Sequence, residues 1–148
     1  MRGWPVHDGN KLIRFVVDNI VNGGDLDLVR DHFAPDYRLH KTGLSVPDGP
    51  EAFKMAVRQW RAAFPDYRVA VQAVIAEEDL VACRFVAQGT HQGALLGMPP
   101  SGRTFTVHGT DVHRVRDGLV VESWLADDIP RLLYDLGLLR PAASSSWT

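Results

Sequence analysis

The hydrophobic periodicity of the chain changes at Pro65, and this change limits the possible folds more than any other feature. Before Pro65, apolar residues recur at the three- and four-residue spacing of amphipathic helices. After it, they alternate with polar residues, as in strands that bury one face. Helices followed by strands predict an α+β domain in which the helices cover one face of a curved, mostly antiparallel sheet.

Three helices and a short strand are expected before the change of period. The first helix covers Lys11–Asn22, where two glycines end it, and a shorter one covers Asp25–Phe33. Tyr37–His40 alternates as a short strand. Asp48, followed by Pro50 and a glutamate, has the composition of a helix N-terminus with the aspartate as its cap. The third helix therefore begins there.

The third helix carries a stripe of large apolar side chains at helical spacing. Core packing alone accounts for such a stripe. A second interpretation is that its aromatic members also line a ligand cavity. The stripe consists of Phe53, Val57, Trp60 and Phe64.

Four long strands and a last helix are expected after the change of period. Alternation predicts strands at Val69–Ile75 and Val81–Gln88, with an acidic turn between them. A second hairpin joins Thr104–Val115 to Leu119–Ala126 around an Asp-Gly turn. The closing helix covers Asp128–Gly137, with its aspartate as the cap and a proline in its first turn.

Size and composition suggest one soluble domain. The 148 residues, 45% of them apolar, suffice for a single core, which we expect within residues 1–140, followed by a disordered tail at 141–148. The charge of -2 and the scattered basic residues disfavour nucleic acid and anionic membrane as partners. No apolar run could span a bilayer and no leader pattern is present, so a cytoplasmic protein is expected. The single Cys83 excludes an internal disulfide.

The motifs that bind common cofactors are missing from the sequence. It contains no phosphate loop, no GxGxxG, no CxxC pair and no HExxH. We therefore expect chemistry without a cofactor.

A glycine- and proline-rich segment, GTHQGALLGMPPSGRT, covers Gly89–Thr104. Its glycines and paired prolines predict that a strand leaves the sheet, folds over as a flap and returns. Such a flap suits the mouth of a pocket. His91 in this flap either lines the mouth or is a solvent-exposed or backbone-bonded residue, and both interpretations stay open.

The strand Thr104–Val115 presents two different faces. One face is mostly apolar and should point to the core, and it carries Asp111 and His113. A carboxyl among apolar neighbours is costly to ionise, which predicts a raised pKa for Asp111, as is typical of a catalytic carboxyl. A structural Asp111, bonded to a backbone donor or to Ser123, is the alternative. The face consists of Phe105, Val107, Gly109, Asp111, His113 and Val115.

The opposite face of this strand argues against a metal site and for a dimer. His108 points away from Asp111 and His113, so the three cannot converge on one ion from a regular strand, and no metal is expected. The outer face is flat and weakly charged, which predicts a homodimer built through it. Its residues are Thr106, Thr110, Val112, Trp124 and Ala126.

The register of the last hairpin depends on its turn. A two-residue turn would place Asp111 opposite Trp124, whereas a three-residue loop would place it opposite Ser123. The residues leave both registers open.

Three segments together resemble a known family. The segment GTHQGALLGMPPSGRT, the hairpin from Phe105 to Asp128 and the closing LLYDLG helix resemble the SnoaL-like polyketide cyclases of the nuclear transport factor two-like superfamily. The resemblance covers roughly Lys11 to Leu139. It implies a cone-shaped fold whose strongly curved sheet wraps around N-terminal helices and an internal pocket, and it also implies a homodimer.

The resemblance implies a cofactor-independent cyclase or isomerase acting on a hydrophobic, polyketide-type metabolite. A cofactor-independent hydroxylase of a polyketide is one alternative, and a non-catalytic small-molecule-binding or dimerisation module is another. A deep apolar cavity with a buried Asp111 would favour the enzyme, and a filled cavity would favour the module.

Two positions that carry polar residues in the family carry leucine in this chain. The general acid/base carboxylate of the aldol-type cyclases maps onto Leu125, and the asparagine that follows the family's PDY motif maps onto Leu39. The family histidine maps onto Asp111, which also matches the protonated aspartate of the more distant ketosteroid isomerase. Leu125 therefore makes a templated, cycloaddition-type closure as reasonable as an aldol closure. The shared parity of Asp111 and Leu125 favours the three-residue loop, with Ser123, Leu125 and Asp127 inside.

These considerations define the candidate site. The catalytic candidates are Asp111, His113, His91 and Asp127. The substrate-binding candidates are Tyr37, Leu39, His40, Trp60, Phe64, Met98, Ser123 and Leu125.

Overall fold

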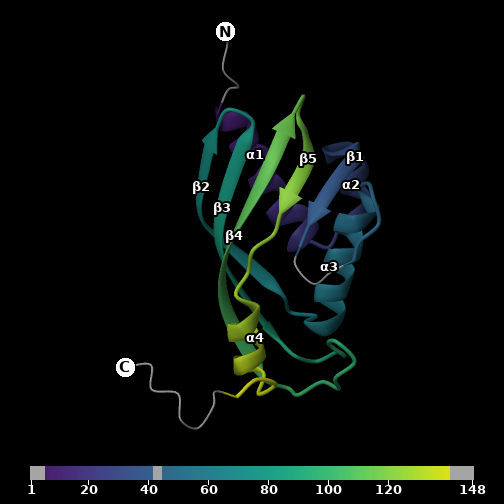
Figure 1. Ribbon diagram of the computed structural model, residues 1–148, viewed down its shortest axis with the longest axis vertical. Coiled ribbons are helices and arrows are strands. Elements are labelled where there is room, and N and C mark those ends of the chain that lie inside the picture. Colours follow the sequence, from purple (N-terminus) through teal and green to yellow (C-terminus); the bar gives the residue numbers. More distant parts are fainter. Residues whose placement is uncertain (1–5, 42–44, 141–148) are drawn as a thin grey trace.

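The computed structural model describes residues 6–41 and 45–140, and the expected tail at 141–148 lies outside them. A five-stranded sheet curves around the N-terminal helices, as the sequence and the family resemblance predict (Figure 1). Its strand order is β1-β5-β4-β3-β2, with β1 parallel to β5 and every other pair antiparallel. The elements are α1 (Val6–Phe15), π-helix η1 (Val16–Val21), 3-10 helix η2 (Leu26–Leu28), α2 (Val29–His32), β1 (Phe33–His40), α3 (Glu51–Ala63), β2 (Arg68–Glu77), β3 (Leu80–Thr90), β4 (Thr104–Arg116), β5 (Leu119–Trp124) and α4 (Ile129–Asp135).

The helices form where the sequence predicts them, with differences at their ends. The first helix continues as a π-helical turn, in which Asn22 N donates to Val17 O. Strand β1 begins at Phe33, four residues earlier than expected, because Pro35 and the residue before it favour extended backbone. The expected cap at Asp48 is wrong, since Pro50 occupies the N-cap and no side chain in the described part of the chain caps α3.

A β-bulge in β2 changes which residues face the core. Val71 pairs with Phe85 but Ala73 pairs with Arg84, so Gln72 is an extra residue that reverses the alternation. Ile75 would share the face of the buried Val69 in an unbroken alternation, but it is 69% exposed, while Val74 packs against the core. Bulges depend on pairing with the neighbouring strand, which alternation in one strand does not reveal.

The β4–β5 hairpin also contains a bulge. Asp117 and Gly118 both have positive φ, 53° and 76°, as a two-residue turn of this kind requires. Val121 is then the extra residue, because Arg114 pairs with Glu122 whereas Val115 pairs with Val120. His113 therefore lies opposite Ser123, and neither register considered for Asp111 occurs.

The core lies between the concave face of the sheet and the helices (Figure 1). Phe105 and Val107 of β4 are buried with Leu132 of α4 and with Leu136, the C-cap of that helix. Asp128 caps α4 as expected, its carboxylate accepting a hydrogen bond from Arg131 N at 3.1 Å. No helix in the described part of the chain is long and apolar enough to cross a membrane.

Candidate active site

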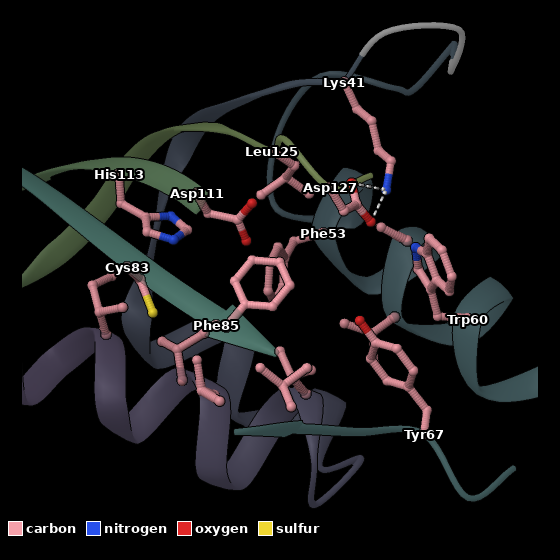
Figure 2. A pocket seen from close by; sticks show the side chains of 17 residues that line it. Lys41, Phe53, Trp60, Tyr67, Cys83, Phe85, Asp111, His113, Leu125 and Asp127 are labelled. Atoms are coloured by element: carbon pink, nitrogen blue, oxygen red, sulfur yellow. Dashed lines mark hydrogen bonds and ion pairs between the residues drawn. The ribbon is translucent and has the colours of Figure 1, made fainter. Parts of the chain in front are cut away.

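A cavity of about 80 Å³ lies between the helices and the concave face of the sheet. This is room for roughly six water molecules. Apolar side chains predominate, and charged or ionisable groups gather on one side, mainly on β4 and after β5 (Figure 2). The lining residues are Ile13, Val16, Val17, Val21, Lys41, Phe53, Ala56, Val57, Trp60, Tyr67, Val69, Cys83, Phe85, Asp111, His113, Leu125 and Asp127.

Asp111 lies in the middle of the polar side of this cavity (Figure 2). Its Oδ1 accepts a hydrogen bond from the backbone N of Ala126 at 3.1 Å. Burial, together with the charge of Asp127, raises the pKa of Asp111 to about 7, although the Ala126 N–H and the Lys41 charge lower it. The predicted rise in pKa is thus confirmed, and the carboxyl exchanges its proton near neutral pH.

Asp127 is held beside Asp111 by the segment that follows β5. This segment runs along β4, where Thr110 N donates to Ala126 O at 2.9 Å and Gly109 bridges to Asp127. A Cβ at Gly109 would lie 2.9 Å from Ala126 O and would also meet the ring of Phe85. Glycine therefore permits the close approach that places Asp127 in the site.

Lys41 provides the positive charge of the cavity lining. Its Nζ lies 3.4 Å from both carboxylate oxygens of Asp127, and the side chains of Lys41 and Asp127 are only 11% and 9% exposed. The same ammonium lies 4.7 Å from the centroid of the Trp60 ring, a cation–π distance. The ion pair keeps a carboxylate and an ammonium together in a mostly apolar cavity.

His113 is buried and uncharged. Its Nδ1 lies 2.7 Å from Ser123 Oγ, and its side chain faces the cavity beside Asp111 (Figure 2). Burial lowers the pKa of His113 to about 4, so the imidazole is neutral at physiological pH. A neutral imidazole can donate or accept a hydrogen bond at its second nitrogen.

Tyr67 brings a hydroxyl into the cavity from the residue before β2 (Figure 2). Burial, together with the charges of Asp127 and Asp111, raises the pKa of Tyr67 well above its ordinary value. The phenol therefore keeps its proton and is available as a donor near the two carboxyl groups.

The family assignment rests on most of the chain. The sequence model of the family described as SnoaL-like polyketide cyclase matches residues 11–136. The chain belongs to this family. It is therefore a polyketide-cyclase-type enzyme with a small-molecule substrate.

Individual relatives agree with this assignment. The cyclase is 32% identical over 119 residues to nogalonic acid methyl ester cyclase of Streptomyces nogalater, covering 78% of this chain and 88% of that one. It is 34% identical over 97 residues to aklanonic acid methyl ester cyclase AcmA of Streptomyces galilaeus, covering 62% and 64%. The crystal structure of IdmH from Streptomyces antibioticus matches with a TM-score of 0.75 at 35% identity, covering 87% and 98%.

Five of the residues proposed from the sequence come together around the cavity of this cyclase. Asp111, His113 and Asp127 line it with Trp60 and Leu125. Ser123 lies directly behind His113, fully buried. Leu125, to which the acid/base carboxylate of the aldol-type cyclases maps, lies beside Asp111 in Figure 2.

The flap residues do not line the cavity. His91 is fully buried, with Nδ1 2.9 Å from Ser101 Oγ and accepting a hydrogen bond from Ser101 N at 3.1 Å. Met98 lies in a tight turn, paired with Leu95. The flap is held against the end of α3, where Gly93 N donates to Ala63 O at 3.0 Å.

The remaining substrate-binding candidates lie in the core or on the outer surface. Tyr37 and Leu39 are buried in the core behind the site, and Phe64 packs with its ring 4.6 Å from that of Phe105. His40 lies outside, 2.6 Å from Glu122 and stacked on Trp124. These four do not line the cavity.

His108 is exposed on the outer face of β4, as its parity predicts. Among the residues that the structure describes, no three His, Cys, Asp or Glu side chains are grouped to hold a metal ion.

Sequence reasoning missed Lys41 and Tyr67, although an extended alternation would have found both. Lys41 follows Leu39 by two residues, and both point inward from the β1 side. Tyr67 precedes the inward-facing Val69 by two residues. Each lies just outside a predicted strand, where strand boundaries are least certain.

Proposed function

We propose that this cyclase closes a ring in a hydrophobic polyketide-type substrate without a cofactor, with Asp111 as acid and base. The observation that carries the proposal is the Asp111 carboxyl, inside an apolar cavity, with its pKa raised to about 7. General acid–base catalysis is most effective when the pKa of the catalytic group lies near the working pH. Both forms of Asp111 are then populated.

The proposed step is an intramolecular aldol closure. The Asp111 carboxylate removes a proton from a carbon next to a substrate carbonyl, which produces an enolate. The enolate carbon forms a bond to a second carbonyl carbon of the same molecule, whose oxygen becomes an alkoxide. Protonated Asp111 returns its proton to that alkoxide, so the carboxylate is regenerated and no atom or electron is gained or lost.

The shape of the cavity supports the same proposal. A flexible chain held among Phe53, Phe85 and Trp60 would have few conformations, which lowers the entropic part of the barrier to closure. An open cavity with Asp111 inside favours an enzyme over a binding module whose cavity is filled.

A closure by templating alone is the second candidate. It is favoured by Leu125, an apolar side chain in the cavity lining at the position of the family carboxylate. A cycloaddition-type closure needs no base, so the two candidates differ in their dependence on Asp111.

Turnover of a defined substrate distinguishes the two candidates. Two relatives are named as cyclases of nogalonic and aklanonic acid methyl esters, so these compounds are the first substrates to assay. Asp111→Asn keeps the volume and removes the acid, and we expect it to lower kcat by about 10²-fold or more. Unchanged kcat in this variant would reject the acid/base role and support templating. Failure of both esters would direct the search to other polyketides of similar size.

A further inference from the structure

Two buried histidines of this protein each lie beside a serine hydroxyl, but their second ring nitrogens have different surroundings. His113 Nδ1 lies 2.7 Å from Ser123 Oγ, and His91 Nδ1 lies 2.9 Å from Ser101 Oγ. His91 Nε2 is sealed in the interior and has no hydrogen-bond partner among the described residues. His113 instead lines the cavity, and its Nε2 makes no hydrogen bond to a described residue and is not sealed. This nitrogen is therefore available to a ligand.

A second hydroxyl behind Ser123 decides which nitrogen of His113 carries the proton. The Tyr37 hydroxyl is fully buried and makes no hydrogen bond to any described residue. The Ser123 hydroxyl is the neighbouring side-chain group that lowers the Tyr37 pKa, which partly offsets the rise that burial causes. The three groups form a row that runs from the core to the cavity.

One order of donors in this row gives every buried proton an acceptor to face. If His113 Nδ1 carried the proton, three protons would share two contacts, so the proton of either the serine or the phenol would have no acceptor. In the reverse order, Ser123 donates to His113 Nδ1 and its oxygen is left free to face the Tyr37 proton. Since an unpaired buried donor is costly, the second order is favoured and the imidazole proton lies on Nε2.

We propose that His113 is a catalytic residue whose Nε2–H donates to the carbonyl oxygen that becomes an enolate, while Ser123 and Tyr37 are positioning residues that fix its tautomer. The proposal rests on the proposed ring closure. His113 and Asp111 are two residues apart on one face of β4, which separates them by about 7 Å along the strand. A carbonyl oxygen held by His113 would thus place its neighbouring carbon towards Asp111.

The donor is suited to an enolate because it stays neutral. Burial lowers the pKa of His113 to about 4, so the imidazole is not a cation at the pH at which Asp111 exchanges its proton. Preorganised donors that face a developing negative charge provide a large part of many enzymatic rate accelerations.

The tautomer is measured without any substrate. Long-range ¹H–¹⁵N NMR of the labelled full-length protein should show His113 with its proton on Nε2. Ser123→Ala should produce a mixture of tautomers, and Tyr37→Phe should do so to a smaller extent. A proton on Nδ1 of His113 in the unmodified protein would overturn the proposal. This result does not depend on the identity of the substrate, so it is separable from the proposed function.

Kinetics on a turned-over ester test the catalytic role. Removal of one oxyanion donor is expected to lower kcat by about 10²-fold, with a smaller change in KM, in His113→Leu. His113→Gln retains an N–H donor and should recover part of the rate, and it also serves if the leucine variant does not fold. Ser123→Ala should lower kcat by about 10-fold.

Ser101→Ala is the matched control, because it removes the serine hydroxyl from the histidine that does not line the cavity. We expect its kcat to equal that of the unmodified enzyme. Equal losses of kcat in Ser101→Ala and Ser123→Ala would indicate a merely structural effect and would overturn the proposal. So would an unchanged kcat in folded His113→Leu.

Discussion

The Lys41 ammonium lies 3.4 Å from the Asp127 carboxylate, and both side chains line the cavity that contains Asp111. The two charges act on Asp111 in opposite directions, since Asp127 raises its pKa and Lys41 lowers it. The ion pair therefore adjusts the proton affinity of the proposed acid/base in addition to holding Asp127 in a mostly apolar place.

Lys41→Met should shift the pH dependence of the reaction. Without the ammonium, Asp127 is an unpaired anion beside Asp111, and the pKa of Asp111 should rise by roughly one unit. The acid limb of the kcat/KM profile, which reports the base form of Asp111, would then move to higher pH. Asp127→Asn should move it to lower pH, and Lys41→Arg should leave it in place. Shifts in the same direction for Lys41→Met and Asp127→Asn would contradict this coupling.

Two buried groups should give opposite contributions to the pH dependence of stability. The pKa of Asp111 is raised from 3.8 to about 7 in the folded protein, so its contribution falls as pH rises from about 4 to 7. The pKa of His113 is lowered from 6.5 to about 4, so its contribution rises with pH between about 4 and 6.5. The two contributions largely cancel in the unmodified protein.

Removal of one group should reveal the contribution of the other. As the pH rises from 4 to 6.5, the free energy of unfolding of Asp111→Asn should increase by on the order of 3 kcal/mol, whereas that of the unmodified protein should change little. His113→Gln should show a decrease of similar size. Urea unfolding at a series of pH values measures both, and parallel curves for all three proteins would refute the assignment.

Leu125→Asp places a carboxyl at the family position, but we expect it to lower stability without raising kcat. A third carboxyl would join Asp111 and Asp127 in a mostly apolar lining, and burying it without a partner should cost about 1–3 kcal/mol of stability. Thermal unfolding and kcat on a turned-over ester test this, with Leu125→Asn as the uncharged control. A higher kcat at unchanged stability would show that the position has a catalytic use and that the templating interpretation is wrong.

Gly109→Ala should displace the backbone segment that carries part of the site. The new Cβ would meet Ala126 O at 2.9 Å, and backbone cannot rotate away as a side chain can. The displaced segment carries the N–H that binds Asp111 and also carries Asp127. We expect a loss of about 1–3 kcal/mol in stability together with a loss of turnover. Thr110→Ala, on the exposed face of the same strand, is the control that should change neither.

We propose that the cyclase is a homodimer through the outer sheet face, where Val112 and Trp124 are half-buried between exposed small residues. Light scattering coupled to size exclusion should give twice the monomer mass at about 50 µM protein. Trp124→Glu should shift the mass towards the monomer, whereas Arg84→Glu, on the same face of β3, should have a smaller effect. A monomer for the unmodified protein at this concentration would reject the proposal.

The sequence alone determined the order of helices and strands and the inward position of Asp111. Both follow from local rules, because a helix or strand buries one face and a regular strand turns every second side chain to the same side. The raised pKa of Asp111 followed in turn, since the neighbours on that face are apolar. These features depend on residues close together in the chain.

Tertiary structure alone decided the register and the final composition of the site. The extra residues Gln72 and Val121 are visible only in the pairing with the next strand, and one of them places His113 opposite Ser123. Lys41 meets Asp127 across 86 positions of sequence. Such contacts form because separate segments pack against each other, and the free energy of that packing is not written in the periodicity of any one segment.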